Sequence, residues 1–296
     1  MSLNALFDVP APAKLNLFLH VVGRRGDGYH LLQSLLVLLD WSDTLHFERR
    51  QDGRLQRHDL GLALPADDLS LRAARLLQRE SGTRIGADIS IDKQVPWAAG
   101  LGGGSSNAAS TLLALNRLWE LHWPRPRLAE LGVRLGADVP FFIGGRNALV
   151  EGIGERLTPL TVPRQWLALL KPAAGLATQD VFSHPALVRD TPPVILARLT
   201  ADAAKPGFWW SDMEAYGRND LQLPAEDCCP DVALGAEWLR QSFGNSRMTG
   251  SGSAVFARNG TSDQPEKPWP ARVLAPGWIG RMCRSLDQHP LLDWAG

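Results

Sequence analysis

The chain has 296 residues, which allows one large domain or two smaller ones. Its 31 lysines and arginines balance 31 aspartates and glutamates, and this zero net charge argues against nucleic acid as a partner, because backbone phosphates bind a basic excess. The chain also shows no leader-like N-terminus, no long apolar run and no zinc or disulfide spacing among its three cysteines, so we expect a cytoplasmic protein without a membrane partner.

The N-terminal third predicts strands followed by a helix. Residues 13–23 are rich in β-branched and aromatic side chains and predict a strand, which the turn-rich stretch GRRGDGYH (23–30) ends. Residues 31–39 are apolar and predict a buried strand, although periodicity alone does not exclude a helix. Leucine and alanine recur at helical spacing over 67–80, and alternation over 87–93 predicts another strand.

The most informative stretch is VPWAAGLGGGSSNAASTLLALNRLWEL at 95–121, which predicts a glycine loop and a helix directly after the strand at 87–93. Four glycines within five positions leave the backbone amides unobstructed, and either Ser105 or Ser106 would suit the N-cap of the helix. Free amides and a helix N-terminus together form an anion site, most often for phosphate. A flexible hinge or a close packing point is the structural alternative.

Two common phosphate loops do not fit this stretch. A Walker A motif needs a Gly-Lys-Ser/Thr sequence, and the loop contains no lysine. The dinucleotide fingerprint needs a final glycine where this chain has Ser105, and no acidic ribose partner is evident about 20 residues further on. The loop therefore indicates phosphate binding without identifying the reaction.

The second half of the chain predicts a change of pattern. A short helix over 127–136 precedes a hairpin over 148–159 that turns at 152–154, and a strand follows at 166–171. A further helix is expected at 230–243 and a strand–turn–strand at 247–258.

Two stretches, 185–212 and 258–270, are expected to be irregular because of their prolines. We place a domain boundary near residue 160, which divides the chain into 1–160 and 161–296.

Four further residues have a functional and a structural interpretation. Lys14 lies in an otherwise apolar strand and could equally be a surface lysine. Asp138 lies between a helix end and a proline and could be a turn or cap residue. Tyr29 and His30 follow the glycine-rich turn and could simply pack the loop. No two histidines show metal-ligand spacing, so no protein metal cage is expected.

Taken together, five stretches resemble the GHMP kinases: PAKLN at 12–16, GDGYH at 26–30, GLGGGSSN at 100–107, LGADVPFF at 135–142 and TGSGSAV at 249–255. The glycine loop alone marks the superfamily. The GDGYH and LGADVPFF stretches are most similar to those of the members that act on 4-diphosphocytidyl-2-C-methyl-D-erythritol, in the non-mevalonate route to isoprenoid precursors.

This resemblance implies an α+β fold of two domains. The N-terminal one would be similar to the ribosomal S5 domain 2-like fold, and the C-terminal one would be ferredoxin-like. It also implies that the γ-phosphoryl group of ATP, bound with Mg²⁺, is transferred to the 2-hydroxyl of the small cytidyl substrate. The enzyme would be a monomer or a homodimer.

The resemblance also assigns roles to residues. Asp138 would be the base that accepts the hydroxyl proton, and Lys14 the cation that keeps this carboxylate ionised and offsets charge in transit. Tyr29 and Phe182 would sandwich the cytosine ring, and His30 would bind its polar edge.

Asn16 and Thr178 would contact polar groups of the substrate, and the hydroxyl of Ser105 or Ser106 would lie near Mg²⁺. The ATP phosphates would be wrapped by the residues of the loop: Trp97, Ala98, Ala99, Gly100, Leu101, Gly102, Gly103, Gly104, Ser105, Ser106 and Asn107.

One departure and two alternatives remain open at this point. Where the family pattern has Met-Gly-Gly, this chain has Trp97-Ala98-Ala99, which bears on the contacts to adenosine more than on the phosphate cradle. The chain could instead be a homoserine-type or mevalonate-type GHMP kinase. It could also be a catalytically silent nucleotide-binding regulator, against which the intact Lys14 and Asp138 argue.

Overall fold

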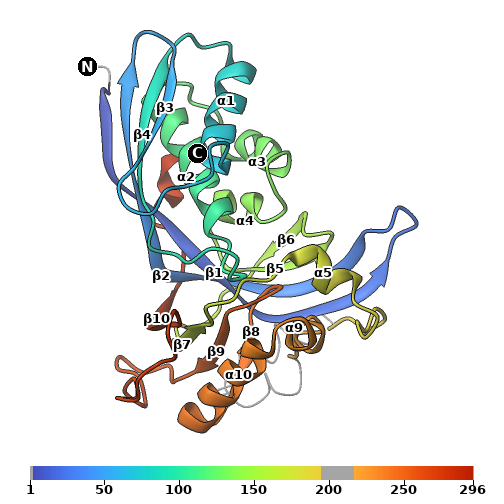
Figure 1. The fold of residues 1–296 in the computed structure, drawn as a ribbon. Coiled ribbons are helices and arrows are strands. Elements are labelled where there is room, and N and C mark those ends of the chain that lie inside the picture. The colour runs from blue at the N-terminus through green and yellow to red at the C-terminus, as the bar shows by residue number, and fades with distance from the viewer. Residues whose placement is uncertain (1–2, 195–216, 296) are drawn as a thin grey trace.

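The computed structural model describes residues 3–194 and 217–295, and it confirms a mixed α+β architecture (Figure 1). Up to residue 160 the elements in chain order are β1 (Ala5–Arg24), β2 (His30–Arg50), β3 (Leu55–Asp59), α1 (Leu69–Ser81), β4 (Gly86–Asp92), α2 (Gly103–Leu118), α3 (Arg125–Val133), α4 (Val139–Gly144), β5 (Ala148–Gly152) and β6 (Arg156–Pro159). The later elements are β7 (Trp166–Lys171), α5 (Thr178–Ser183), α9 (Gln222–Cys228), α10 (Pro230–Phe243), β8 (Arg247–Met248), β9 (Val255–Arg258), β10 (Ile279–Leu286) and the 3₁₀ helix η1 (Leu292–Trp294).

Two long antiparallel strands, β1 and β2, form the axis of the molecule (Figure 1). β2 also pairs with β4, β5 and β10, so one sheet extends in the order β3-β4-β2-β10-β7-β9-β8. The β1–β2 register shifts between Pro12 and Lys14 and again between Asn16 and Phe18. Such irregularities re-aim side chains, and here they flank Lys14 and Asn16, two buried polar residues of β1.

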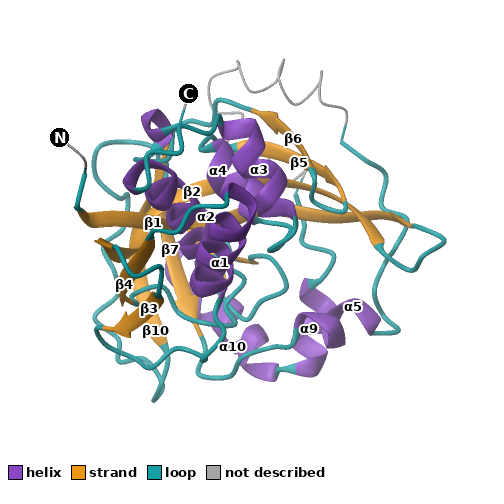
Figure 2. Cartoon of the chain, turned by 90° about the horizontal axis from the view of Figure 1, so that it is seen from above, coloured by secondary structure: helices purple, strands orange, loops and turns teal. Residues whose placement is uncertain are grey.

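Helices α1–α4 gather on one side of the N-terminal strands (Figure 2). The innermost, α2, is buried on nearly all sides, and its buried residues include serine, threonine and asparagine as well as leucine and alanine, so it is not an amphipathic surface helix. Its Leu112 and Leu115 belong to one core with Leu38, Phe47 and Ile89 of the sheet.

Helix α10 covers the C-terminal strands, and its Val232 and Leu239 share a core with Leu170 and Val255. Leu19 of β1 packs in this core as well, so the hairpin of β1 and β2 contacts the helices and strands of both halves of the chain.

The segment after β10 returns to the N-terminal helices. The backbone N–H of His289 donates to the Gly145 carbonyl at 2.8 Å, just beyond the C-terminus of α4. Arg125 of α3 donates to the carbonyls of Leu291 and Ala295 at 3.3 and 3.2 Å, and also to that of Ile143. Residues 289–295 therefore brace the far end of the short helix α4.

Most predicted elements are confirmed. β7 and α10 have the predicted bounds, and the strands, the hairpin and the loop at 258–270 lie where the sequence indicated. The predicted irregular stretch 185–212 is free of helix and strand over 185–194, and the remainder lies outside the described residues. Within the described part of the chain, no helix is both long and apolar enough to cross a membrane.

The predicted serine N-cap of α2 is wrong. The cap residue is Gly102, with a φ of 67°, and it makes no side-chain cap bond. A Cβ at Gly102 would lie 2.9 Å from Cγ of Lys14, so close packing as well as the left-handed backbone demands glycine there.

Candidate active site

A cavity of about 1230 Å³ lies where β1, the glycine loop, the start of α4, α5 and the turn at 250–252 meet. Every predicted site residue except Ser106 lines it: Lys14, Asn16, Tyr29, His30, Trp97, Ala98, Ala99, Gly100, Leu101, Gly102, Gly103, Gly104, Ser105, Asn107, Asp138, Thr178 and Phe182. Residues that are far apart in the sequence thus converge on one cavity.

The loop before α2 packs against the turn that follows β8. The backbone N–H groups of Ser253 and Ala254 donate to the carbonyls of Ala98 and Ala99, each at 3.2 Å. A Cβ at Gly100 would lie 2.2 Å from the Thr249 carbonyl oxygen, so this close approach requires glycine. Two regions about 150 residues apart in the sequence therefore shape the loop together.

The N-terminus of α2 opens into the cavity. The Ser106 N–H donates to the Gly102 carbonyl at 2.9 Å, so the amides of Gly103, Gly104 and Ser105 precede the first intrahelical bond. These amides and the positive end of the helix dipole suit an anion.

The two serines of the loop differ. Ser106 is fully buried and donates its hydroxyl to the Pro12 carbonyl at 2.6 Å, so this side chain fixes α2 to β1. Ser105 is only partly buried and lines the cavity. Of the two predicted hydroxyls, only that of Ser105 is available to a ligand.

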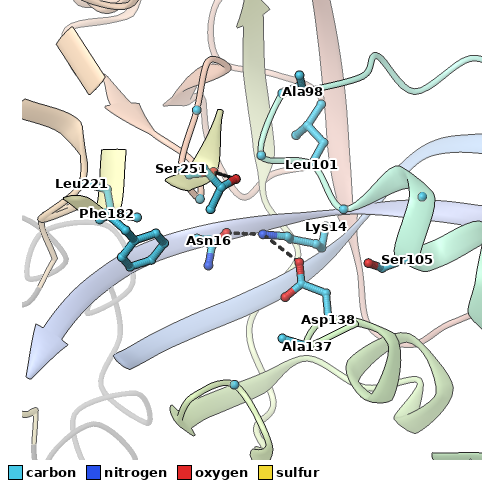
Figure 3. A pocket seen from close by; sticks show the side chains of 18 of the residues that line it. Lys14, Asn16, Ala98, Leu101, Ser105, Ala137, Asp138, Phe182, Leu221 and Ser251 are labelled. Carbon is cyan, nitrogen blue, oxygen red and sulfur yellow. Dashed lines mark hydrogen bonds and ion pairs between the residues drawn. The ribbon is translucent and has the colours of Figure 1, made fainter. Parts of the chain in front are cut away.

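Lys14 and Asp138 point toward each other in the cavity (Figure 3). Lys14 Nζ lies 3.5 Å from Asp138 Oδ2 and donates to Asn16 Oδ1 at 2.6 Å. The Lys14 side chain is 5% exposed, which excludes the interpretation as a surface lysine. The Asp138 side chain is 37% exposed and makes no cap bond to α4, so its carboxylate is open to a ligand.

Asn16 connects this pair to the C-terminal half. Its N–H donates to Thr249 Oγ1 at 2.8 Å, and its side-chain amide donates to Ser34 Oγ at 2.7 Å. The Ser34 hydroxyl in turn donates to the Phe18 carbonyl. The acceptor oxygen of Asn16 therefore faces Lys14 in a fixed orientation.

The other end of the cavity is aromatic. The rings of His30 and Phe182 lie 5.2 Å apart between centroids at an interplanar angle of 31°, and Tyr29 beside them is 63% exposed. Burial, together with the charges of Arg189 and Arg24, lowers the pKa of His30.

Thr178, at the first position of α5, shares a hydrogen bond of 2.9 Å with Ser251. Thr178 thus lies between this aromatic end and the turn next to Asn16.

Sequence reasoning missed an ion pair beneath the loop. The ammonium of Lys93 pairs with the fully buried carboxylate of Asp43, which also accepts the N–H groups of Gln94 and Val95 at 2.7 Å. Burial lowers the pKa of Lys93, and Asp43 opposes this effect. Fifty residues separate the two partners, so no local pattern indicated the pair.

Among the residues that the structure describes, no group of three His, Cys, Asp or Glu side chains could hold a metal ion. A magnesium ion bound with a nucleotide would still fit this cavity, because Mg²⁺ keeps several waters and takes most other ligands from phosphates. The Ser105 hydroxyl and the Asp138 carboxylate are oxygen donors of the kind that it prefers.

Comparison with known proteins gives three findings. Residues 68–146 match the family model described as GHMP kinases N terminal domain. The chain is 61% identical to 4-diphosphocytidyl-2-C-methyl-D-erythritol kinase of Methylibium petroleiphilum, over 100% of both chains. It is 53% identical to the enzyme of that name from Variovorax paradoxus, over 99% of this chain and 100% of the relative.

The comparison with solved structures gives the same family as these relatives. A crystal structure of 4-(cytidine 5'-diphospho)-2C-methyl-D-erythritol kinase matches with a TM-score of 0.71 and 33% identity, over 86% of this chain and 90% of that one. A mevalonate kinase matches with a TM-score of 0.66 over 96% and 99% of the two chains, but its 12% identity shows the fold alone. The architecture is therefore the two-domain one that these kinases share.

Proposed function

The chain belongs to the family of 4-diphosphocytidyl-2-C-methyl-D-erythritol kinases within the GHMP kinases, and from this premise we propose that it transfers the γ-phosphoryl group of ATP to the 2-hydroxyl of that cytidyl alcohol. It is an ATP-dependent kinase of isoprenoid biosynthesis. The observation that carries the proposal is that the Lys14–Asp138 pair and the N-terminus of α2 line the same cavity.

The glycine loop holds the phosphates of ATP. The amides of Gly103, Gly104 and Ser105 donate to phosphate oxygens, and the α2 dipole favours their negative charge. The Ser105 hydroxyl would hold Mg²⁺, which supplies neutralisation of phosphate charge when bound. Lys93 and Asp43 keep the strand leading into the loop in place.

Asp138 acts as the base. Its carboxylate accepts the proton of the 2-hydroxyl as that oxygen attacks the γ-phosphorus of ATP. The bond between the γ-phosphorus and the β,γ-bridging oxygen breaks, and ADP is released. The ammonium of Lys14 attracts the carboxylate and offsets the charge of the phosphoryl group in transfer. Asn16 holds that ammonium in place and also contacts the alcohol.

The aromatic end binds the cytosine. Tyr29 and Phe182 stack on the two faces of the ring, His30 binds its polar edge, and Thr178 contacts the polar groups that follow. Mevalonate and homoserine carry no nucleobase that could bind between aromatic rings. This end of the cavity therefore favours the cytidyl substrate over either of them.

The two domains would divide near residue 160, into 1–160 and 161–296. The six residues between β6 and β7 belong to no helix or strand, which supports a division there.

A phosphoryl-transfer screen tests the proposed function. The enzyme is incubated with ATP and Mg²⁺ and, separately, the cytidyl alcohol, 2-C-methyl-D-erythritol 4-phosphate, mevalonate or homoserine, and ³¹P NMR follows each product. We expect a new phosphate ester and one ADP per ester only with the cytidyl alcohol. Comparable turnover of mevalonate or homoserine would contradict the substrate assignment. Thermal protection by ATP without turnover of any acceptor would indicate a silent regulator.

A further inference from the structure

Arg189 lines the aromatic end of the cavity, and its guanidinium donates hydrogen bonds to four acceptors. Its Nε donates to Nε2 of His30 at 3.2 Å, across 159 residues of sequence. One terminal nitrogen donates to the Leu187 carbonyl at 2.9 Å. The other donates to the carbonyls of Phe182 and His184 at 3.3 and 3.1 Å. Arg189 thus connects the histidine of β2 to the segment that carries Phe182.

The chemistry of this contact fixes the proton of the histidine. A guanidinium only donates hydrogen bonds and stays charged in proteins. The Nε2 of His30 must therefore accept, and the ring proton of neutral His30 must sit on Nδ1. Burial, followed by the charges of Arg189 and Arg24, lowers the pKa of His30, so both effects favour the neutral ring.

We infer that Arg189 determines the base specificity of this site by holding His30 as the neutral Nδ1–H tautomer. The remaining ring nitrogen of His30 can then donate a hydrogen bond but cannot accept one. Cytosine presents two acceptors, N3 and O2, on its pairing edge, whereas uracil presents an N–H at the same ring position. A uridyl substrate would place two donors against each other, so the site rejects it. The inference rests on the proposed function, since it takes the bound base to be a pyrimidine.

Arg189 is a positioning residue in this account, because it acts through His30. Its three carbonyl contacts also order the segment that carries Phe182, so loss of affinity alone would not separate the two roles. The readout must therefore be the tautomer itself and the choice between bases.

The first measurement is the tautomer. Long-range ¹H–¹⁵N NMR of the ¹⁵N-histidine-labelled enzyme, with His30 assigned through the His30→Asn variant, reports which ring nitrogen carries the proton. We expect Nδ1–H in the wild type and a shift toward Nε2–H in Arg189→Met. Arg24→Met is the matched control, because Arg24 is a second cation near His30 whose side chain donates to the Gly28 carbonyl and, among the described contacts, not to the His30 ring. It should leave Nδ1–H in place. Nε2–H in the wild type would overturn the inference.

The second measurement is the ratio of kcat/KM for the cytidyl alcohol to that for its uridyl analogue. We expect a wild-type ratio of about 100 or more, reduced about tenfold or more in Arg189→Met and unchanged in Arg24→Met. His30→Asn keeps the carbonyl contacts of Arg189 and offers an amide that can donate or accept, so its ratio should fall as well.

A wild-type ratio retained by Arg189→Met and His30→Asn would overturn the role of Arg189 in specificity. A wild type that turns over neither substrate would instead refute the proposed function and the pyrimidine assignment together, while the NMR result still decides the tautomer.

Discussion

The two ends of the cavity are built differently. At the transfer end Lys14 and Asn16 are buried and bonded to fixed partners, and the loop packs against a turn from the other half of the chain. At the aromatic end, which is the recognition end of the cavity, Tyr29 is largely exposed. Among the described contacts, the hydrogen bonds of Arg189 alone connect His30 to the segment of Phe182. Phosphoryl transfer depends on fixed geometry, whereas the cytosine of the substrate must be able to enter between the aromatic side chains.

Replacing Asp138, the proposed general base at the transfer end, should have the largest effect on turnover. We expect Asp138→Asn to lower kcat by about 10²–10⁴-fold while the unfolding midpoint changes little, because the carboxylate is one-third exposed and makes no cap bond. Asp287→Asn is the control, since Asp287 is also exposed and paired with a cation, Arg164, but lies outside the cavity. Steady-state kinetics and thermal melts give both values. Near-wild-type turnover would exclude Asp138 as the base.

The brace behind α4 should make the fold sensitive to acid. Burial and the charge of Arg125 lower the pKa of His289 to about 3. Because this folded-state pKa lies below the unfolded value, the contribution of neutral His289 is complete above about pH 6.5 and declines as the pH falls toward 3.

His289→Asn keeps an acceptor for the Leu291 N–H but cannot titrate in this range. Its unfolding free energy should therefore fall less between pH 6.5 and pH 4, by at most about 3 kcal/mol. Urea unfolding at a series of pH values measures the difference, with the exposed His122→Asn as the control. Equal slopes for His289→Asn and the wild type would show that the brace does not titrate.

A side chain on the loop should separate phosphate binding from folding. Gly104 is exposed, and a Cβ there would lie 3.5 Å from Leu69, an ordinary contact, whereas at Gly103 it would lie 2.8 Å from Lys93 Nζ. We expect Gly104→Val to weaken ATP binding about tenfold or more, equivalent to about 1.4 kcal/mol, with an almost unchanged melt without nucleotide. Calorimetric titration measures this loss.

Gly26→Val, where a Cβ meets open space, is the control for this substitution. Full thermal protection of Gly104→Val by ATP would argue against the phosphate cradle.

The recognition end should show the smallest effect. Removing the exposed ring in Tyr29→Ala should raise KM for the cytidyl substrate roughly fivefold, about 1 kcal/mol, and leave KM for ATP nearly unchanged. Tyr29→Phe keeps the ring and serves as the control. If KM for ATP rose more than KM for the cytidyl substrate, the assignment of the two ends would be reversed.

Local sequence patterns predicted the part of the site that is contiguous in the chain. The glycine loop and the helix after it are contiguous, and α10 has the predicted bounds because Pro230 and Gly244 mark its two ends. The resemblance placed Lys14, Asp138 and the aromatic residues on one site, and all of them line one cavity.

Contacts across long sequence separations were beyond local patterns. Asp43 pairs with Lys93, and Arg189 donates to His30, and only the folded chain brings the partners of each pair together. The cap of α2 was mispredicted because the close approach of Lys14 selects glycine over a capping serine. No strand was predicted over Ile279–Leu286, which pairs with β7 and β2 from the far end of the chain.

The brace formed by residues 289–295 has a consequence for the order of assembly. During synthesis α4, which follows Asp138 directly, leaves the ribosome more than a hundred residues before His289 is added. N-terminal parts of large chains generally fold first, so this half collapses while the far end of α4 still lacks its covering segment. The geometry around Asp138 is therefore among the last features of the nascent protein to be completed, although its residues are among the first half to be made.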